Sequence, residues 1–561
     1  MLLSELARRM RIEFPGPAPG APVPAEGAPV PPEGVPPPGG PFPWDGKAEV
    51  AFGRGAGDGA GDGPPDPDLT GATEDSRAVG PGFLFCAFKG ASADGRSFIP
   101  QAEAAGCGAT ICSPPDPGGA RPRILVTAES LRGAASEASR LVYGEPDAGL
   151  FMVGITGTNG KTTVCHLVES LLAEAGQAPG LIGTVGMRLP GGEEREAPNT
   201  TPEGPLLWKT LRDMADDGGK SAVMEVSSHA LSLGRLGGLS FGAALFTNLS
   251  RDHLDFHADM EAYFKAKSLL FLGRGGSLEA GPGPGAPKMS LANADDPWGR
   301  RILAVPNLNA VGFGFKQGSV RGEVMKSGRG GVTLKVSSHR RDMTVRSRLL
   351  GRFNAENLLA AAAFGLAMGY GSDLIVRALS RSPGAPGRLS PVGTDERYLA
   401  LVDYAHAPGA LEAAVSAARD LNPSRVIVLF GCGGDRDKGK RPMMGAAAAK
   451  GDLVVLTSDN PRTEDQLAII ADAEKGVVEY GLARGDPSKA PNSKRTVSGV
   501  YYVEPDRAKA IWLGVSLMRD GDILLVAGKG HENYQITGRE KRPFDDREET
   551  LKALRGAGKS E

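Results

Sequence analysis

Residues 150–163 read Leu-Phe-Met-Val-Gly-Ile-Thr-Gly-Thr-Asn-Gly-Lys-Thr-Thr. The stretch begins as an apolar strand and passes through a glycine-rich turn that ends in Lys161. Apolar residues then recur with the helical period over 164–172. A turn of this kind at the start of a helix holds phosphates through its backbone N–H groups and the positive end of the helix. The stretch therefore predicts a mononucleotide site in an α/β fold.

The residues of this turn have distinct predicted roles. Lys161 supplies a point charge for the β- and γ-phosphates, and Thr162 offers a hydroxyl to Mg²⁺. The strict pattern G-x-x-x-x-G-K-[ST] is absent, because Ile155 stands where its first glycine would be. The alternative is a glycine-rich turn followed by an ordinary helix. The predicted phosphate-binding residues are Gly157, Thr158, Asn159, Gly160, Lys161, Thr162 and Thr163.

The bulk properties of the chain exclude several classes of protein. Its 561 residues favour about three or four domains. The formal net charge of −2 argues against a nucleic-acid or membrane-surface protein. No apolar run is long enough to cross a membrane, and the N-terminus does not read as a secretory signal. The five cysteines form no C-x-x-C pair, which is typical of a reducing cytoplasm. We expect a cytoplasmic monomer without nucleic-acid or membrane partners.

Two stretches interrupt the structured pattern. Residues 14–68 are dominated by proline, glycine and alanine and cannot bury enough apolar surface to offset their chain entropy. We expect a disordered insertion there. A second glycine- and proline-rich stretch, 273–287, predicts a surface loop.

The rest of the chain alternates between short apolar runs and helical patterns, as in parallel sheets covered by helices. Residues 320–344 alternate around an Arg-Gly-Gly turn and predict an antiparallel hairpin. The predicted strands are 83–88, 109–112, 124–126, 221–226, 243–248, 288–292, 398–403, 425–429, 452–457 and 522–527. The predicted helices include 97–105, 130–143, 260–272 and 354–368. The domain boundaries are expected near 148 and 386, giving domains of residues 1–148, 149–385 and 386–561.

Two predicted strands of the central part end in polar residues. Glu225 stands at the carboxyl end of a buried-looking strand, where a carboxylate can hold Mg²⁺ directly or through water. Residues 247–257 follow the next strand and contain His253, His257 and two aspartates, Asp252 and Asp255. One histidine could be a satisfied core residue, and the acids could cap helices. A zinc site is weakly indicated, since no partner pair with ligand spacing occurs. Beside a nucleotide site, we expect a Mg²⁺ role for His253.

Lys267 lies in the largely apolar helix predicted over 260–272. A buried lysine loses its charge readily, and a neutral amine can react with CO₂ to give a carbamate, which is an anionic metal ligand. Taken alone, the residues favour a surface lysine whose stem lies along the apolar helix and whose charge reaches water.

Three polar loops follow parallel strands of the C-terminal part and should gather at one edge of the sheet. They contain the cations Arg436 and Arg462 and the anions Asp459 and Glu532. Such a mixture suits a zwitterionic ligand such as an amino acid. The alternative is a set of solvated loops that pair their charges among themselves.

These motifs together resemble the Mur ligase family, most closely its tripeptide synthetases, over nearly the whole chain apart from the proline-rich insertion. The motifs are Asp75-Ser-Arg77, Pro81-Gly-Phe-Leu-Phe85, Gly157-Thr-Asn-Gly-Lys-Thr162, Asn199-Thr-Thr-Pro202, Glu225-Val-Ser-Ser-His229, Asn248-Leu-Ser-Arg-Asp-His-Leu-Asp255, Gly351-Arg-Phe-Asn354, Asp403-Tyr-Ala-His406, Gly431 to Pro442, Asp459-Asn-Pro-Arg462 and Gly528-Lys-Gly-His-Glu532. Leu233, the Leu389-Ser390 pair and Glu74 depart from the family pattern and leave details of substrate contacts open.

The resemblance implies a three-domain α/β fold, with a central P-loop-type parallel sheet and a C-terminal Rossmann-like domain. It implies an ATP- and Mg²⁺-dependent ligase that adds meso-diaminopimelate to the D-glutamate carboxylate of UDP-N-acetylmuramoyl-L-alanyl-D-glutamate through an acyl phosphate. That reaction belongs to peptidoglycan precursor synthesis. The N-terminal domain would bind the UDP-muramoyl substrate, the central domain ATP and the C-terminal domain the amino acid.

The resemblance also implies roles for individual residues. Lys267 is the lysine that becomes a carbamate, and this reverses the expectation from the residues alone. The implied catalytic residues are Lys161, Glu225, His253 and Lys267, and the implied metal ligands are Thr162, Glu225, His253 and carbamylated Lys267. The implied base and ribose contacts are Asn293, Arg388 and Asp403. The implied UDP-muramoyl dipeptide contacts are Ser76, Asn199, Thr200, Thr201, Ser227 and Arg235. The implied diaminopimelate contacts are Arg436, Asp459, Asn460, Pro461, Arg462, Gly528 and Glu532.

Arg462 is the reason to expect diaminopimelate rather than L-lysine, since a guanidinium can hold a second carboxylate bidentately. The same ligation with L-lysine or another diamino acid is the nearest alternative. A phosphotransferase or nucleotide switch built on the same phosphate loop would explain residues 153–163 but not the three C-terminal loops. Intact Lys161, Glu225 and Lys267 argue against a silent binding protein.

Overall fold

A computed structural model describes residues 1–10, 48–51, 66–90, 93–339, 341–393, 395, 397–487 and 499–560, with backbone only for 48–51. The chain forms two compact units, and each is described by itself. The first unit comprises Met1–Arg321 and Ala360–Ile375, and the second comprises Gly322–Leu359 and Val376–Glu561. The domain boundaries expected near 148 and 386 stay predictions.

The first unit opens with a small sheet whose strand order is β1-β5-β4-β3-β2. Strands β2 to β5 are parallel, as the alternating pattern predicts. Apolar side chains of α1 and α3 and of these strands form one core cluster. The elements are α1 (Leu3–Arg9), β1 (Ala48–Ala51), β2 (Gly71–Thr73), β3 (Phe83–Cys86), α2 (Ile99–Ala104), β4 (Ala109–Cys112), β5 (Arg123–Val126) and α3 (Leu131–Val142).

The disorder expected over 14–68 does not hold for residues 48–51 or for residues 66–68, which contact the N-terminal residues through Asp66 and Pro67. Residues 48–51 form β1, which pairs antiparallel with β5 at the edge of the small sheet. The pairing joins backbone groups far apart in the chain, so the composition of the stretch could not reveal it. Residues 14–47 and 52–65 of that stretch lie outside the described residues.

Helix α3 packs closely against α5 (Gly204–Asp216) within the first unit. The buried Ser136 hydroxyl of α3 lies 2.9 Å from Arg235 O and accepts a 2.9 Å hydrogen bond from the indole of Trp208 on α5. The two helices approach each other closely at Gly204, where an added Cβ would lie only 2.6 Å from Ser136. The small sheet and the central sheet are thereby held together.

The central sheet has the strand order β16-β15-β14-β13-β12-β11-β6-β10-β7-β8-β9. Strands β7, β10, β6, β11, β12 and β13 are parallel neighbours, and β8 and β9 extend one edge antiparallel. Its strands and helices in the first unit are β6 (Phe151–Thr156), α4 (Lys161–Glu174), β7 (Pro179–Gly183), β8 (Gly186–Arg188), β9 (Glu194–Arg195), β10 (Ser221–Glu225), α6 (Ser228–Ser232), β11 (Ala243–Phe246), α7 (Met260–Leu272), β12 (Met289–Asn293), α8 (Pro297–Leu303) and β13 (Ala310–Gly314).

The predicted hairpin over 320–344 is confirmed in its first two strands, and a third strand follows. Strands β14 (Val320–Gly328) and β15 (Gly331–Ser338) are neighbours on either side of the predicted turn. Strand β16 (Arg341–Ser347) pairs antiparallel with β15. The boundary between the two units falls within β14 and within α9 (Arg352–Ala367), and α10 (Ser372–Arg381) also belongs to both.

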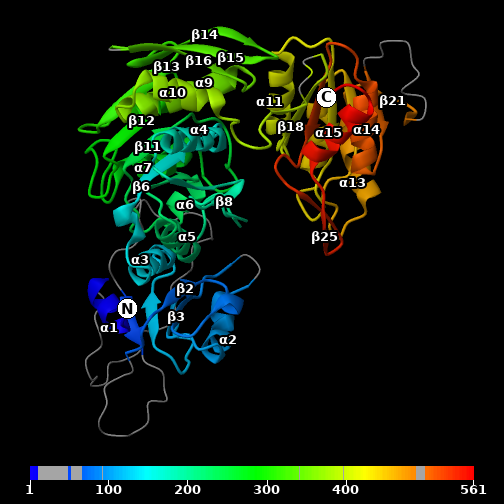
Figure 1. The fold of residues 1–561 in the computed structure, drawn as a ribbon. Helices are drawn as coiled ribbons and strands as arrows, with labels where there is room; N and C mark the ends of the chain where they lie inside the picture. The colour runs from blue at the N-terminus through cyan, green and yellow to red at the C-terminus, as the bar shows by residue number, and fades with distance from the viewer. Residues whose placement is uncertain are drawn as a thin grey trace, which may run out of the picture. The chain divides into compact units, whose positions relative to one another are not determined.

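The sheet of the second unit has the strand order β17-β18-β23-β19-β20-β22-β21, with all but the β17–β18 pair parallel. Alternate residues of β18 and β19 enter opposite cores: Leu399 and Val426 pack with α11, α12 and α13, whereas Ala400 and Ile427 pack with α14 and α15. Helices therefore cover both faces, as a parallel sheet requires. Helices α14 and α15 lie side by side (Figure 1).

The elements of the second unit follow one another in this order: β17 (Ser390–Val392), β18 (Leu399–Asp403), α11 (Pro408–Arg419), β19 (Val426–Phe430), α12 (Lys440–Ala448), β20 (Leu453–Leu456), α13 (Gln466–Glu479), β21 (Ala483–Arg484), β22 (Val500–Val503), α14 (Arg507–Leu517), β23 (Ile523–Ala527), β24 (Tyr534–Thr537), β25 (Glu540–Pro543) and α15 (Asp546–Gly556). Strands β24 and β25 pair as a separate antiparallel hairpin. Among the helices that the structure describes, none is both long enough and apolar enough to cross a membrane.

Candidate active site

The phosphate loop lies between β6 and α4, as the sequence predicts. Gly157 has a φ of 146°, and a Cβ at this position would lie 1.9 Å from Thr247 Oγ1. Only glycine fits that approach. Gly160, with a φ of 86°, precedes the first residue of α4. The ammonium of Lys161 donates to the carbonyls of Gly157 and Thr158 at 3.0 and 2.9 Å, so it lies against the loop.

A second loop, which follows β11, braces the phosphate loop. Asn248 accepts a hydrogen bond from Thr158 N through its backbone oxygen (2.8 Å) and one from Asn159 N through Oδ1 (3.0 Å). Thr247 Oγ1 donates to Asn159 O at 2.6 Å. The sequence assigned no role to Asn248, although its position directly after a strand was a signal. It fixes two peptide groups of the turn.

Thr162 and Glu225, both predicted from the sequence to hold Mg²⁺, are brought together. Thr162 Oγ1 donates to Glu225 Oε2 at 2.9 Å, and Glu225 Oε1 accepts from Thr184 N at 2.7 Å. Glu225 is buried at the end of β10. A Cβ on Gly183 would lie 2.5 Å from Glu225 Oε1, so a side chain at this position would clash with the carboxylate.

The Thr162–Glu225 pair fits a magnesium ion by its chemistry, because Mg²⁺ prefers hydroxyl and carboxylate oxygens. Within the part of the chain that the structure describes, no group of three or more histidine, cysteine or acidic side chains is assembled to hold a metal. An ion at this pair would take further ligands from a nucleotide's phosphates, as magnesium commonly does.

His253 belongs to a cluster of aromatic rings beside the site. Its ring centroid lies 4.9 Å from that of His229 and 6.0 Å from that of Tyr263. His253 has a φ of 53° and a partly exposed side chain. The side chain of His257, in contrast, is buried. Burial lowers the pKa of His257 to about 4, and its Nε2 lies 2.9 Å from Ser228 Oγ. His257 is therefore the satisfied core histidine that the sequence left open.

Lys267 is buried, so the surface position favoured by the residues alone is wrong. Its side chain is 1% exposed, and Nζ donates to Gly157 O at 2.8 Å. That carbonyl also accepts from Lys161. Burial, and then the positive charge of Lys161, hold the pKa of Lys267 well below its usual range. The amine also lies 4.7 Å from the centre of the Tyr263 ring, the ring that His253 approaches.

Four residues implied in UDP-muramoyl binding lie near Glu225 or are linked to it. Thr201 Oγ1 donates to Glu225 O at 2.8 Å and accepts from Ser227 N at 3.0 Å. Arg235 donates to Thr201 O at 3.0 Å, and Thr200 Oγ1 lies 3.0 Å from Thr184 Oγ1. Thr201 has no exposed surface, so its hydroxyl supports the end of β10 from inside.

The other two residues of that set lie apart from these contacts. Asn199 is exposed. Ser76 follows β2 in the small sheet, where its hydroxyl donates to Gln101 Oε1 at 3.1 Å. No recorded contact among the described residues joins Ser76 to the residues around Glu225.

The residues implied in base and ribose binding occur in both units. Asn293 ends β12 in the first unit, and its Oδ1 accepts from Asp295 N at 3.0 Å. Asp403 ends β18 in the second unit, where its carboxylate accepts from Leu389 N and Ala405 N at 2.7 and 2.8 Å. Burial raises the pKa of Asp403, against the lowering effect of Arg388.

The three polar loops of the second unit meet at the carboxyl ends of β19, β20 and β23, as the sequence predicts. A Cβ on Gly431 would lie 2.8 Å from Asp459 N, and one on Gly528 would lie 3.1 Å from Asp459 Oδ2. Arg462, with a φ of 50°, donates through Nη1 to Gly434 O at 2.7 Å. Arg436 is exposed and donates to Asp435 O at 3.2 Å.

Sequence reasoning missed the hairpin β24–β25 and its hydrogen bonds to the loop that contains Arg462. Gln535 Nε2 donates to Asp459 O at 2.6 Å, and Ile536 N donates to Asn460 Oδ1 at 2.9 Å. Arg462 N donates to Ile536 O at 3.1 Å. The loop 459–462 is therefore held like an added strand by residues more than seventy positions later. Nothing local in either segment signals this pairing.

A fully buried ion pair lies under the same loops. Arg507 of α14 donates to Asp546 of α15 at 2.7 and 2.6 Å, and both side chains are 0% exposed. Arg507 also donates to Ser458 O and Ala527 O, at the ends of β20 and β23. The pair thus joins two helices to the strand ends that carry the polar loops.

Replacing Arg507 with methionine should lower the free energy of unfolding by about 3–5 kcal/mol, because Asp546 would keep a buried charge without its partner. A guanidinium titration followed by circular dichroism would measure the change. Arg542→Met is the matched control, since Arg542 and Glu540 pair on the exposed hairpin. Equal unfolding midpoints for the two variants would contradict the prediction.

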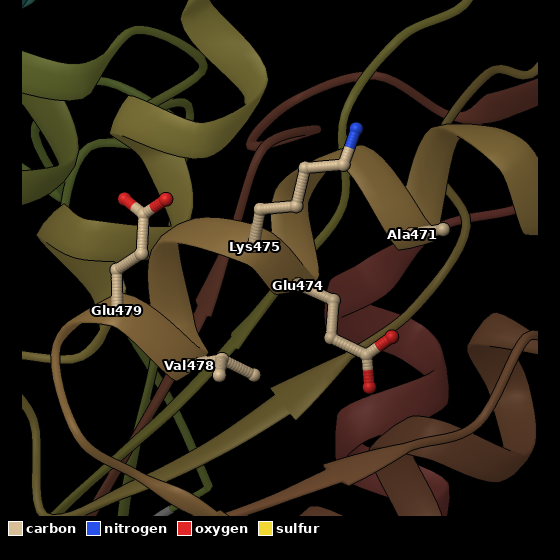
Figure 2. Close-up of a pocket in the computed structure, with 5 residues that line it drawn as sticks. All are labelled: Ala471, Glu474, Lys475, Val478 and Glu479. Atoms are coloured by element: carbon tan, nitrogen blue, oxygen red, sulfur yellow. The ribbon is translucent and has the colours of Figure 1, made fainter.

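A shallow depression on α13 lies elsewhere on the second unit. It is lined by Ala471, Glu474, Lys475, Val478 and Glu479, whose side chains project from one helix without converging (Figure 2). Lys475 pairs with Asp472, and Glu474 accepts from Tyr501. The side chains do not converge, so the depression offers no arrangement for chemistry.

Comparison with known protein families matches three consecutive parts of the chain. Residues 68–136 match the Mur ligase family catalytic domain, 155–365 the Mur ligase middle domain and 387–530 the Mur ligase glutamate ligase domain. The fold, with its central phosphate-loop sheet and Rossmann-like C-terminal sheet, is the three-domain Mur ligase fold. The chain belongs to the Mur ligase family.

Particular relatives are similar over most of their length. A UDP-N-acetylmuramoyl-L-alanyl-D-glutamate–2,6-diaminopimelate ligase of Solibacter usitatus is 42% identical over 496 residues, 88% of this chain and 94% of the relative. The ligase of the same name from Geobacter metallireducens is 41% identical over 87% of this chain and 94% of the relative. A solved structure of a ligase of this name superposes with a TM-score of 0.60 and 31% identity, covering 89% of this chain and 97% of that chain.

Proposed function

We propose that the protein is an ATP-dependent ligase that adds meso-diaminopimelate to UDP-N-acetylmuramoyl-L-alanyl-D-glutamate during peptidoglycan precursor synthesis. The observation that carries the proposal is the 42% identity, over 88% of the chain, to a ligase named for these substrates. The phosphate loop, the Thr162–Glu225 pair and the buried Lys267 support it, since together they suit the transfer of a phosphoryl group from a nucleotide, which the proposed ligation requires.

The proposed chemistry has two steps. An oxygen of the D-glutamate carboxylate attacks the γ-phosphorus of ATP, which releases ADP and leaves an acyl phosphate. The amine of diaminopimelate then attacks the acyl carbon, and collapse of the tetrahedral intermediate releases phosphate and a proton as the amide forms. Activation is needed because a carboxylate is a poor electrophile, whereas phosphate is a good leaving group. The protein contributes positioning and charge neutralisation.

The residues around the phosphate loop have separate proposed roles in this positioning and charge neutralisation. Lys161 neutralises phosphate charge, and the loop residues 157–163 bind the phosphates. Thr162, Glu225, His253 and carbamylated Lys267 would hold Mg²⁺, which supplies further neutralisation of the phosphates when bound. Asn293, Arg388 and Asp403 would bind the base and ribose of ATP.

Lys267 is proposed to carry a carbamate. Its Nζ lone pair would attack CO₂ and lose a proton, so that a neutral amine becomes an anion. The depressed pKa of Lys267 favours this reaction, because the neutral amine is the reactive form. The resulting negative charge would lie beside Lys161, whose side chain shares the Gly157 carbonyl with it.

The proposed substrates occupy the remaining predicted residues. Diaminopimelate would bind Arg436, Asp459, Asn460, Pro461, Arg462, Gly528 and Glu532, and the UDP-muramoyl dipeptide would bind Ser76, Asn199, Thr200, Thr201, Ser227 and Arg235. Arg462 favours diaminopimelate over L-lysine, because L-lysine lacks the distal carboxylate that a guanidinium can hold. We further propose that the enzyme acts in the cytoplasm as a monomer on these small molecules.

Phosphate release is the first test of this function. With ATP, Mg²⁺ and UDP-muramoyl dipeptide, the purified protein should release phosphate only when an amino acid is added, and diaminopimelate should be preferred to L-lysine. Mass spectrometry should then detect the lengthened peptide on its uridine carrier. The amino acid is required because the acyl phosphate otherwise has no amine to attack it.

Other results would favour the alternatives. Phosphate release without any amino acid would support a phosphotransferase or nucleotide switch. A preference for L-lysine would keep the ligation but replace the amino acid. No turnover with any amine would leave only a binding protein.

A further inference from the structure

Lys529 follows β23 in the loop 528–532, and no role has yet been assigned to it. Its side chain is 0% exposed. Nζ donates to Asp459 Oδ1 at 3.3 Å, to Asn460 Oδ1 at 3.1 Å and to Glu532 Oε2 at 3.1 Å. Three residues from the predicted amino-acid site therefore share one buried ammonium.

The geometry uses the full donor capacity of this ammonium. A lysine ammonium has three N–H donors, and Lys529 has these three acceptors within hydrogen-bonding distance. The face of the Tyr534 ring lies 5.5 Å away and adds a favourable contact. Lys529 is thus arranged to hold its neighbours in place, not to donate to a ligand.

The carboxylates of Asp459 and Glu532 need such a cation. Both approach the same buried point, and without a positive charge between them their negative charges would repel each other. Asn460 Nδ2 also donates to Glu532 Oε2 at 2.9 Å. The bonds from Lys529 and Asn460 therefore use only one oxygen of each carboxylate, Asp459 Oδ1 and Glu532 Oε2. Among the described residues, neither Asp459 Oδ2 nor Glu532 Oε1 accepts a recorded hydrogen bond.

We propose that Lys529 is a positioning residue of the amino-acid site. It holds the carboxylates of Asp459 and Glu532 in fixed orientations, so that one oxygen of each remains for an ammonium group of the incoming diamino acid. This inference rests on the proposed function and deepens it by naming the residue that prepares the site. A lysine on the hairpin, Lys541, contacts the same Tyr534 ring from an exposed position and carries none of these bonds to Asp459, Asn460 or Glu532.

Steady-state kinetics of the full chain with the variant Lys529→Met tests the proposal, with Lys541→Met as the matched control. Removing a buried partner of charged hydrogen bonds should raise the KM for diaminopimelate by about 30-fold or more. The KM values for ATP and for UDP-muramoyl dipeptide should stay within about twofold, because Lys529 contacts neither predicted site. Lys541→Met should match the wild type in all three KM values.

Two further variants separate positioning from folding. Lys529→Arg keeps the charge and should recover part of the lost affinity for diaminopimelate. In the double variant Lys529→Met/Glu532→Gln, the rise in KM should be smaller than the product of the single effects, since the two residues act through one contact.

Three results would overturn the inference. The first is a KM for diaminopimelate in Lys529→Met equal to that of Lys541→Met, and the second is an equal rise of all three KM values. The third is that Lys529→Met and Lys529→Arg both fail to fold, which would assign the lysine to the fold alone. A wild-type protein that ligates no diaminopimelate would instead overturn the proposed function.

Discussion

Replacing Lys267 with alanine should reduce turnover by about 10²–10³-fold, the usual cost of losing one preorganised charge-stabilising group. The effect is expected because the variant cannot form the carbamate, so an anion next to Lys161 and the phosphate loop is lost. Acetate added to the buffer should restore part of the activity, since a small carboxylate can enter the space left by the side chain. Initial rates of phosphate release with and without acetate would measure both effects.

Lys265→Ala is the matched control for this experiment. Lys265 lies on the same helix α7 but is exposed, so its loss should leave turnover unchanged. Labelled CO₂ should be incorporated by the wild type and by Lys265→Ala and not by Lys267→Ala. Full activity of Lys267→Ala would remove the carbamate from the mechanism.

Replacing Arg462 with asparagine should lower kcat/KM for diaminopimelate by about 10²-fold or more, as expected when one partner of a desolvated charge pair is removed. The reason is the loss of the bidentate contact to the distal carboxylate. Asparagine is chosen because Arg462 has a φ of 50°, a backbone conformation that asparagine tolerates better than most residues. The preference for diaminopimelate over L-lysine should shrink in parallel.

Arg484→Asn controls for the loss of an arginine in the same unit, because Arg484 is exposed and pairs with Glu474 on α13. This variant should retain the wild-type kinetics. The KM for ATP should remain within about twofold in both variants, since neither arginine belongs to the predicted ATP site. A matching rise in the KM for ATP and for diaminopimelate in Arg462→Asn would show a general disturbance of the domain and contradict the selectivity argument.

Much of the fold could be predicted from local patterns. The helix expected over 260–272 has those bounds in the structure, and the strand expected over 109–112 does too. The two-sided burial of the C-terminal strands followed from their continuous apolar runs. The strand β1 could not be predicted, because backbone pairing with the distant strand β5 places it. The third strand β16 pairs with the adjacent β15, and the hairpin predicted over 320–344 covered only its first residues.

The candidate site also has features that could be predicted from the sequence and features that could not. The proximity of Thr162 and Glu225 followed from two strand ends in one parallel sheet. The burial of Lys267 did not, since α7 contains both Lys265 and Lys267 and only its packing on the phosphate loop decides which lysine faces inward. Asn248, Lys529 and the hairpin β24–β25 also act through long-range contacts.

The hairpin limits how the amino-acid preference of this enzyme can be redesigned. Its residues Gln535 and Ile536 form hydrogen bonds with the backbone and side chains of residues 459–462. The conformation of those four residues therefore depends on the hairpin as well as on their own sequence. A graft of the corresponding tetrapeptide from a lysine-adding relative would arrive without the partner strand that shapes it. Successful exchange of selectivity would require the tetrapeptide and residues 534–543 to be transplanted as one block.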